Sequence, residues 1–434
     1  MRIKAVLLSL LFANAVASQD SSFTAKEAID LALKQNLDIQ IASTDLDIAK
    51  ANNNWGNAGG LPTATGNIFN TEAISNINQK LANGSNIERN NVSNSSINAN
   101  LAISWRVFNG MRVRSTMERF DAMEKMGTIA VAQQIDQVIF DVLNIYYNLI
   151  RLNKQVIATK AIIDLSKERL KIAETRFNVG NGAKTDMLQA KIDLNAQEVN
   201  LQNIYKQVSN TKASMNTLLK KDAGASFHPK EEQFSIPSIE YNSLVSKIDQ
   251  QNPQLLLAQQ EKLNLMIEKK IISSQRMPSV NLNSNTVLNR SKSTAGFFLT
   301  NQTFGPNIGL GIGIPIFNGN INKTQLKVNS IQQKKQDLQT EQLRALLQRD
   351  LLIAFQEYEN AVSVSKVEES NVKLAEENNF ISTERFKKLQ SNSIELRQAQ
   401  LSLIEAQDRY INAQYRAQIA ATAIRYITGE ISKQ

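Results

Sequence analysis

Residues 97–106 read INANLAISWR, and this stretch decides the fold. Its larger apolar side chains alternate with polar or small ones, so one face of an extended strand is apolar and the other is not. Residues 280–288 (VNLNSNTVL) and 307–316 (NIGLGIGIPI) repeat the pattern, and residues 61–71 follow it more weakly. Each run is about ten residues long, the length that a tilted strand needs to cross the hydrocarbon core of a membrane.

These four runs predict two β-hairpins, at 61–108 and 277–318, and the Asn- and Ser-rich stretches 74–95 and 290–305 are predicted loops at their ends. Four strands cannot close a barrel, and lipid does not tolerate unpaired strand edges. Copies of the chain must therefore complete a ring. An open pore favours three or more copies over two. The aromatic residues near the predicted strand ends suit interfacial girdles: Phe69, Trp105, Phe108, Phe297, Phe298, Phe304 and Phe317.

The chain also repeats itself. RVFNG at 106–110 returns as PIFNG at 315–319, an offset of 209 positions, whereas upstream positions match at an offset of 216. The change in offset predicts that one loop of the hairpin is shorter in the second half. The further matches are Arg176-Phe177 with Arg385-Phe386 and 186–190 with 395–399 at 209, and Asn36 with Asn252 and Pro62 with Pro278 at 216.

We therefore expect two structural repeats joined by a linker at 222–240. The first repeat, 18–221, should contain a helix that Thr24 and Glu27 cap, the first hairpin and a helical hairpin at 112–221. The second, 241–434, should contain a helix, the second hairpin and a helical hairpin at 320–430. Apolar residues seven apart indicate sustained helix–helix packing, and a proline-free helix from 115 to 177 would reach roughly 95 Å. The heptad positions are 149, 156, 163, 170 and 177, then 194, 201, 208 and 215, and 367, 374 and 381.

Composition narrows the function. Residues 1–17 have the basic start, apolar stretch and Ala-x-Ala end of a signal peptide, so we expect an exported chain. No later stretch is apolar enough for a membrane-spanning helix. The formal charge of +9 is scattered rather than striped, which argues against nucleic-acid binding. The chain has no cysteine and one histidine, His228, and no acid, base and nucleophile converge, so neither an enzyme, a cofactor nor a metal site is predicted.

The doubled order of helix, proline-led hairpin, Phe-Asn-Gly exit, long helix, Arg-Phe turn and returning helix resembles the TolC family of outer-membrane efflux and secretion channels. The resemblance implies an α+β membrane protein of the outer membrane that extends into the periplasm. In it, four strands from each chain of a homotrimer form a twelve-stranded barrel, and coiled-coil hairpins form a long α-helical barrel. It also implies a periplasmic adaptor and an inner-membrane pump as partners.

The same resemblance assigns roles to the two helical turns, the first tip (176–190) and the second tip (385–399). Glu395 and Gln398 match positions that narrow the pore entrance in the family, Ser391 matches a gate-holding arginine, and Asp186 lies at the equivalent place in the first tip. The expected adaptor-docking residues are Arg176, Phe177, Gly180, Arg385, Phe386 and Leu389. Leu389 departs from the family's glycine, and the uncharged Gln398 and Ser391 weaken the case for a double acidic ring with an arginine lock.

The expected function is thus a passive conduit from periplasm to exterior, in tripartite efflux or in type I secretion. The alternative is a periplasmic coiled-coil adaptor or structural protein without a membrane barrel. The alternating strands and their repetition favour the conduit.

Overall fold

The computed structural model describes residues 21–230, 240–295 and 298–433, so the predicted signal peptide and Phe297 lie outside the described residues. The chain divides into two compact units. One comprises the described parts of 1–42, 131–255 and 343–434, and the other comprises 43–130 and 256–342. Each unit is described by itself.

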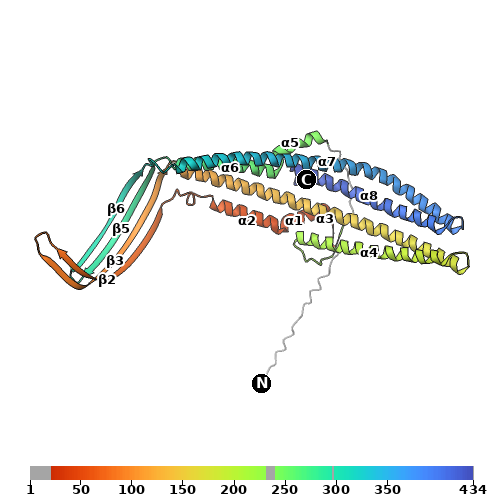
Figure 1. Cartoon of the computed structure of the whole chain (residues 1–434), viewed down its shortest axis with the longest axis horizontal. Coiled ribbons are helices and arrows are strands. Elements are labelled where there is room, and N and C mark those ends of the chain that lie inside the picture. The colour runs from red at the N-terminus through yellow and green to blue at the C-terminus, as the bar shows by residue number, and fades with distance from the viewer. Residues whose placement is uncertain (1–20, 231–239, 296–297, 434) are drawn as a thin grey trace, which may run out of the picture. The chain divides into compact units, whose positions relative to one another are not determined.

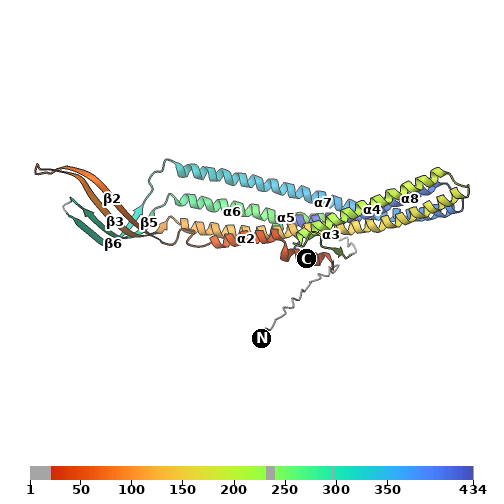
Figure 2. The same ribbon diagram turned by 90° about the horizontal axis from the view of Figure 1, so that it is seen from below.

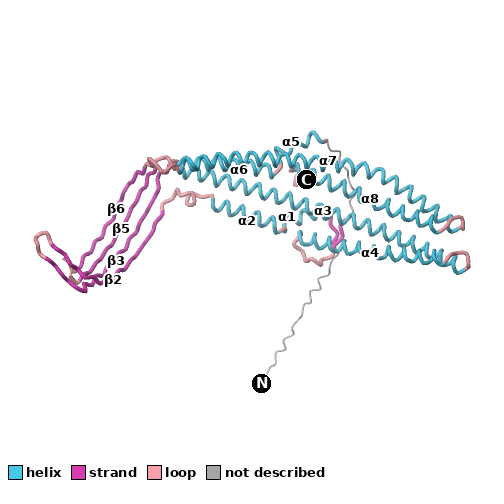
Figure 3. Tube along the Cα trace, viewed as in Figure 1, coloured by secondary structure: helices cyan, strands magenta, loops and turns pink. Residues whose placement is uncertain are grey.

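The second unit holds the predicted sheet. Its strands are β2 (Thr63–Lys80), β3 (Asn86–Asn109), β5 (Ser279–Ser293) and β6 (Thr300–Gly313), paired antiparallel in the order β2-β3-β5-β6 (Figures 1 and 3). The four predicted strands are confirmed. Among the described residues, β2 and β6 each pair on one side only, so both edges of the sheet stay open.

The register places apolar residues from all four strands on one face. Ile68, Ala99, Leu288 and Phe304 stand in one row across the sheet. The neighbouring row belongs to the other face and contains Asn67 and Asn100, and the Asn283 and Asn285 side chains share that face. The face with Ile68 exposes large apolar side chains, 78% of Ile68 and 71% of Phe304.

The strands are longer than alternation predicted. Most of 74–95 and much of 290–305 is paired strand rather than loop, whereas β6 ends at Gly313, before Ile316. The extra residues of the first half lie in β2 and β3, so the predicted shorter loop was wrong. Beyond the apolar band most residues are polar and the few apolar ones, such as Ile74 and Val92, do not alternate regularly, so the periodic signal is lost while the backbone pairing continues. Polar pairs support the ladder there, as where the Ser95 hydroxyl donates to Glu72 at 2.6 Å.

The two Phe-Asn-Gly segments, at 108–110 and 317–319, connect each hairpin to the long helix that follows it. Gly110 and Gly319 have φ values of 67° and 65°, and the residues that follow them, Met111 and Asn320, are left-handed as well, at 70° and 64°. Glycine adopts this conformation without the steric cost of a side chain. At Gly110 a Cβ would also lie 2.5 Å from the Ser274 carbonyl oxygen, which excludes larger residues.

The two long helices are confirmed. α3 (Arg112–Asn178) and α7 (Ile321–Lys387) each have 67 residues, and they return through α4 (Lys184–Leu218) and α8 (Ser393–Thr428). In the first unit the hairpin of α3 and α4 lies beside that of α7 and α8 (Figures 1 and 2), and buried residues pack α3 against α8. No described helix combines the length and apolar character that a membrane-spanning helix needs.

The helix predicted to open each repeat is in fact two. α1 (Ala25–Gln35) precedes α2 (Leu37–Asn52), and α5 (Tyr241–Gln251) precedes α6 (Pro253–Ser274). Asn36 and Asn252 stand at the breaks, and their side-chain amides donate to the carbonyls of Leu218 and Ile427 at 3.1 and 2.8 Å. Their side-chain oxygens cap the next helix, which offsets the interrupted backbone bonding. The predicted Thr24–Glu27 capping box is confirmed.

Each repeat has its own core in the first unit. Val138, Val142 and Met215 are buried in the first core, and the residues 209 positions later, Leu347, Leu351 and Ile424, are buried in the second. A smaller cluster around Ile162 and Leu403 packs α3 against α8. Inside the predicted linker, β4 (Phe227–Pro229) pairs in parallel with β1 (Ser21–Phe23), an element that the sequence did not predict.

Candidate functional site

The two tips have equivalent backbones. In the first, the amide of Gly180 donates to the Phe177 carbonyl at 3.0 Å and that of Asn181 to the Arg176 carbonyl at 2.8 Å. In the second, the residues 209 positions later make the same two bonds, at 3.2 and 2.9 Å. The internal repeat therefore extends to the geometry of the turns. Differences between equivalent side chains then distinguish the two tips.

Leu389 carries a strained conformation. It stands where the first tip has Gly180, and both have positive φ, 61° and 78°. A left-handed conformation costs a residue with a Cβ about 1–2 kcal/mol. The Leu389 side chain is 63% exposed, so little packing offsets that cost.

Leu389→Gly should therefore stabilise the second tip by about 1 kcal/mol. Hydrogen exchange of the amides in 385–399 would show slower exchange in the variant. The matched change Gly180→Ala should accelerate exchange in 176–190, because it introduces the strain that Leu389→Gly removes. Faster exchange in the glycine variant would contradict this account.

Arg176 joins the first tip to the second. Its guanidinium carbon lies 3.8 Å from the centre of the Phe386 ring, and its Nη2 also contacts the Phe386 carbonyl oxygen. Phe386 is only 1% exposed, and burial lowers the pKa of Arg176, opposed by the nearby charge of Asp186. This cation–π contact binds the two turns within one chain.

Glu395 accepts a hydrogen bond from Arg385 at 2.7 Å in a largely exposed ion pair. Asn392 caps α8 by accepting from the Glu395 amide. The predicted entrance carboxylate is thus balanced inside its own chain. Asp186, in the first turn of α4, is half-buried.

The other two predicted entrance residues are uncharged and differ in surroundings. Gln398 is exposed on α8. Ser391 is half-buried, and within the described part of the chain its hydroxyl has no hydrogen-bond partner. Of the predicted docking residues, Phe177, Gly180 and Leu389 are exposed, whereas Phe386 is not.

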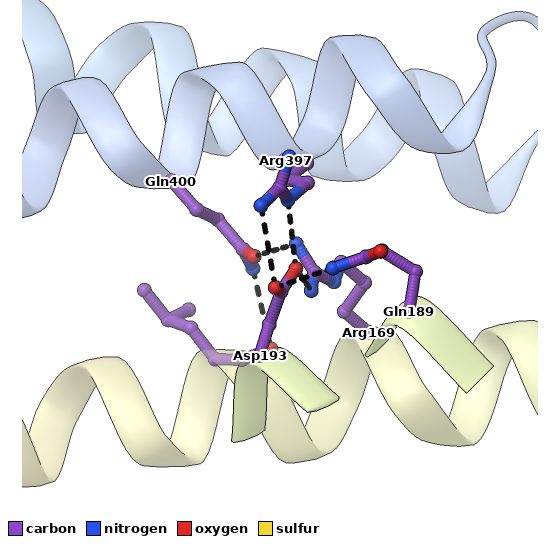
Figure 4. A network of polar contacts seen from close by, with 6 residues as sticks. Arg169, Gln189, Asp193, Arg397 and Gln400 are labelled. Carbon is purple, nitrogen blue, oxygen red and sulfur yellow. Dashed lines mark hydrogen bonds and ion pairs between the residues drawn. The ribbon is translucent and has the colours of Figure 1, made fainter. Parts of the chain in front are cut away.

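A buried ionic network near the tips was not predicted. Asp193 of α4 accepts from Arg397 of α8 at 2.9 Å and from Gln189 at 2.8 Å, and it pairs with Arg169 of α3 (Figure 4). Arg169 is 3% exposed and also donates to Gln400 of α8 at 3.0 Å. The network therefore links three of the four helices that form the tips.

Opposing effects set the charge of Asp193. Burial disfavours its ionised form, but hydrogen bonds from Arg397, Arg169 and Gln189 outweigh burial and lower its pKa. The carboxylate is therefore ionised at neutral pH and compensates the buried Arg169. The sequence did carry a signal, because Ile162, Ser166, Arg169 and Ala173 follow helical spacing, and all four are buried.

Comparisons with solved structures agree on the fold. The chain is similar to the Campylobacter jejuni CmeC outer membrane channel, with a TM-score of 0.77, 16% identity, and coverage of 99% of this chain and 94% of that one. The Vibrio cholerae outer membrane protein VceC gives a TM-score of 0.76 at 17% identity, with coverage of 93% of this chain and 96% of that one. The open Neisseria gonorrhoeae MtrE channel gives a TM-score of 0.68 at 17% identity, with coverage of 94% of this chain and 90% of that one. No curated protein matches the chain in sequence.

A family model described as outer membrane efflux protein matches residues 28–219 and 244–430. The two matched segments correspond to the two repeats and together cover most of the chain. Proteins of this kind are channels of the outer membrane that extend into the periplasm, and they are not enzymes. The chain therefore belongs to the outer membrane efflux protein family and is an outer-membrane efflux channel.

Proposed function

We propose that three copies of this chain form one conduit, in which twelve strands close a barrel in the outer membrane and the helical hairpins line a periplasmic tunnel. The supporting observation is the amphipathic four-stranded sheet, whose edge strands β2 and β6 pair on one side only among the described residues. Related channels in efflux systems are trimeric. Closure by neighbouring copies satisfies both edges, which lipid requires.

Exposed heptad positions on α7 support the same assembly. Val367, Leu374 and Ile381, which the sequence predicts to pack against a helix, are 60%, 61% and 47% exposed in the single chain. Burying apolar surface contributes roughly 25 cal/mol per Å². A neighbouring copy that covered this stripe would give it the packing that the heptad pattern predicts.

The tips form the periplasmic entrance in this proposal. Three copies each of Asp186, Ser391, Glu395 and Gln398 surround it. Because Arg385 neutralises Glu395, the entrance carries less net negative charge than a ring of free carboxylates would. Cation attraction at the entrance is correspondingly weaker.

An adaptor that leads to an inner-membrane pump docks at the tips. A groove between the two turns of one chain includes Thr175, Val179 and Leu389 in its lining. Val179 and Leu389 are 64% and 63% exposed, so they offer apolar contact to a partner. Arg176 and Phe386, expected beforehand to dock the adaptor, already contact each other and serve the tip itself.

Export by cells tests the function. Cells without this chain should accumulate small toxic molecules that wild-type protein removes, and Leu389→Asp should abolish removal while leaving the channel in the membrane. Thr185→Asp, a change at an exposed tip residue outside both the entrance set and the docking set, should retain removal. If the wild-type protein restored secretion of a protein substrate but no small-molecule export, the channel would belong to type I secretion instead.

A further inference from the structure

The internal repeat relates the residues of the first tip to those of the second. An offset of 209 positions carries Arg176 onto Arg385 and Phe177 onto Phe386. The turns that hold these residues share their backbone hydrogen bonds. Arg176 belongs to the first repeat and contacts the second. Arg385 occupies the equivalent position in the second repeat, so it is placed to make the same contact with a neighbouring repeat.

The acidic partners follow the same offset, which carries Asp186 onto Glu395. Asp186 lies close enough to influence the charge of Arg176, and Glu395 pairs with Arg385 at 2.7 Å. Each arginine thus has an acid of its own tip nearby. The first arginine has a second partner, the Phe386 ring at 3.8 Å, and no described residue of the chain supplies such a ring to Arg385.

The two phenylalanines differ in exposure, as the two arginines differ in having a ring partner. Phe386, covered by Arg176, is 1% exposed, whereas Phe177 is 38% exposed although it occupies the equivalent turn position. Within one chain, the arginine of the first tip can contact the phenylalanine of the second tip. The reverse contact, from the arginine of a second tip to the phenylalanine of a first tip, arises only between neighbouring chains of a closed ring.

We propose that Arg385 of one subunit stacks on Phe177 of the next and contacts the Phe177 carbonyl, as Arg176 does with Phe386 within the chain. This inference rests on the proposed ring of three copies. The tips around the entrance are then held by six arginine–phenylalanine contacts, three within chains and three between them. Because Glu395 already pairs with Arg385, the guanidinium can keep its acid and stack on the ring together, as a planar cation allows.

Cross-linking tests the contact directly, since the natural chain contains no cysteine. Phe177→Cys with Arg385→Cys, treated in membranes with a short bis-maleimide, should give covalent dimers and trimers on denaturing gels. The control pair Arg176→Cys with Phe386→Cys should link within one chain and run as a monomer. Each single-cysteine variant should also remain monomeric.

The native mass of the same variant separates two failures. A trimer by mass whose 177/385 cysteines stay unlinked would overturn the proposed contact but leave the ring intact. A monomer by mass would overturn the ring and the contact with it. Phe177 is exposed and Arg385 largely so in the single chain, so replacing them leaves each chain's own core unchanged.

Discussion

Asp193→Asn should destabilise the tips by about 3–5 kcal/mol, the largest effect that we expect from a single change in the helical part. The substitution removes the charge that compensates Arg169, which is 3% exposed. Removing one partner of a buried ion pair leaves an uncompensated charge, and that accounts for the size of the effect. Hydrogen exchange in 162–176 and 393–400 should accelerate, and the conductance of the reconstituted channel should rise as the tips loosen.

Asp186→Asn is the matched control. Asp186 lies one heptad earlier on α4, and it influences Arg176 only through charge, so its replacement should change stability by under about 1 kcal/mol. Equal effects of the two substitutions would contradict a special role for the Asp193 network.

The effect of Asp193→Asn should also depend on pH. Because the pKa of Asp193 is lowered in the folded chain, its ionisation stabilises the fold fully above the unfolded pKa of about 3.9. That contribution is lost as the pH falls through the lowered folded value. The difference between wild type and variant should therefore stay constant from pH 8 to about pH 5 and shrink in stronger acid. A difference that grew in acid would have the wrong sign.

Leu101→Lys should prevent most of the protein from reaching a folded state in the membrane. Leu101 lies on the apolar face of the sheet, opposite Thr286, and is 51% exposed. A lysine on the lipid face near the middle of the bilayer costs about 2–4 kcal/mol in each subunit. Three subunits multiply this cost, so the yield of folded trimer in outer membranes should fall sharply.

Asn100→Lys provides the control at the adjacent position. Asn100 points to the opposite, polar face, which lines the pore in the proposed barrel. The variant should insert normally, and its three added charges should favour anions in reversal-potential measurements. Normal insertion of Leu101→Lys, or failure of Asn100→Lys alone, would show that the two faces had been assigned the wrong way round.

Alternation predicts the strands but not their ends. Around Leu101 one face of the sheet is apolar, and the sequence alternates there because a face in contact with lipid has to be apolar. From Ile97 to Asn86 the pairs mix serine, asparagine and charged residues with scattered apolar ones such as Ile74 and Val92, so the ladder continues without a regular alternation. The offset of 209 positions predicts more, because it relates elements whose local sequences are uninformative, including the tips and the long helices.

Other features depend on contacts between distant segments. Asn36 interrupts its helix because its side chain reaches the end of α4, and no local propensity encodes that partner. β1 and β4 are three residues each, and they pair where Phe23 and Phe227 stack with ring centres 4.7 Å apart. The Asp193 network likewise joins three helices. Sequence patterns thus predict periodic elements, and the tertiary fold decides which polar residues meet.

The most direct test of the whole account is the native mass of the protein extracted from outer membranes in mild detergent. The open edges of β2 and β6 predict that several chains close the barrel together, and the proposed ring predicts three chains in one complex, found in the outer-membrane fraction and absent from the soluble periplasm. A single chain recovered from the soluble fraction would contradict the account, because the sheet would then be sealed without partners.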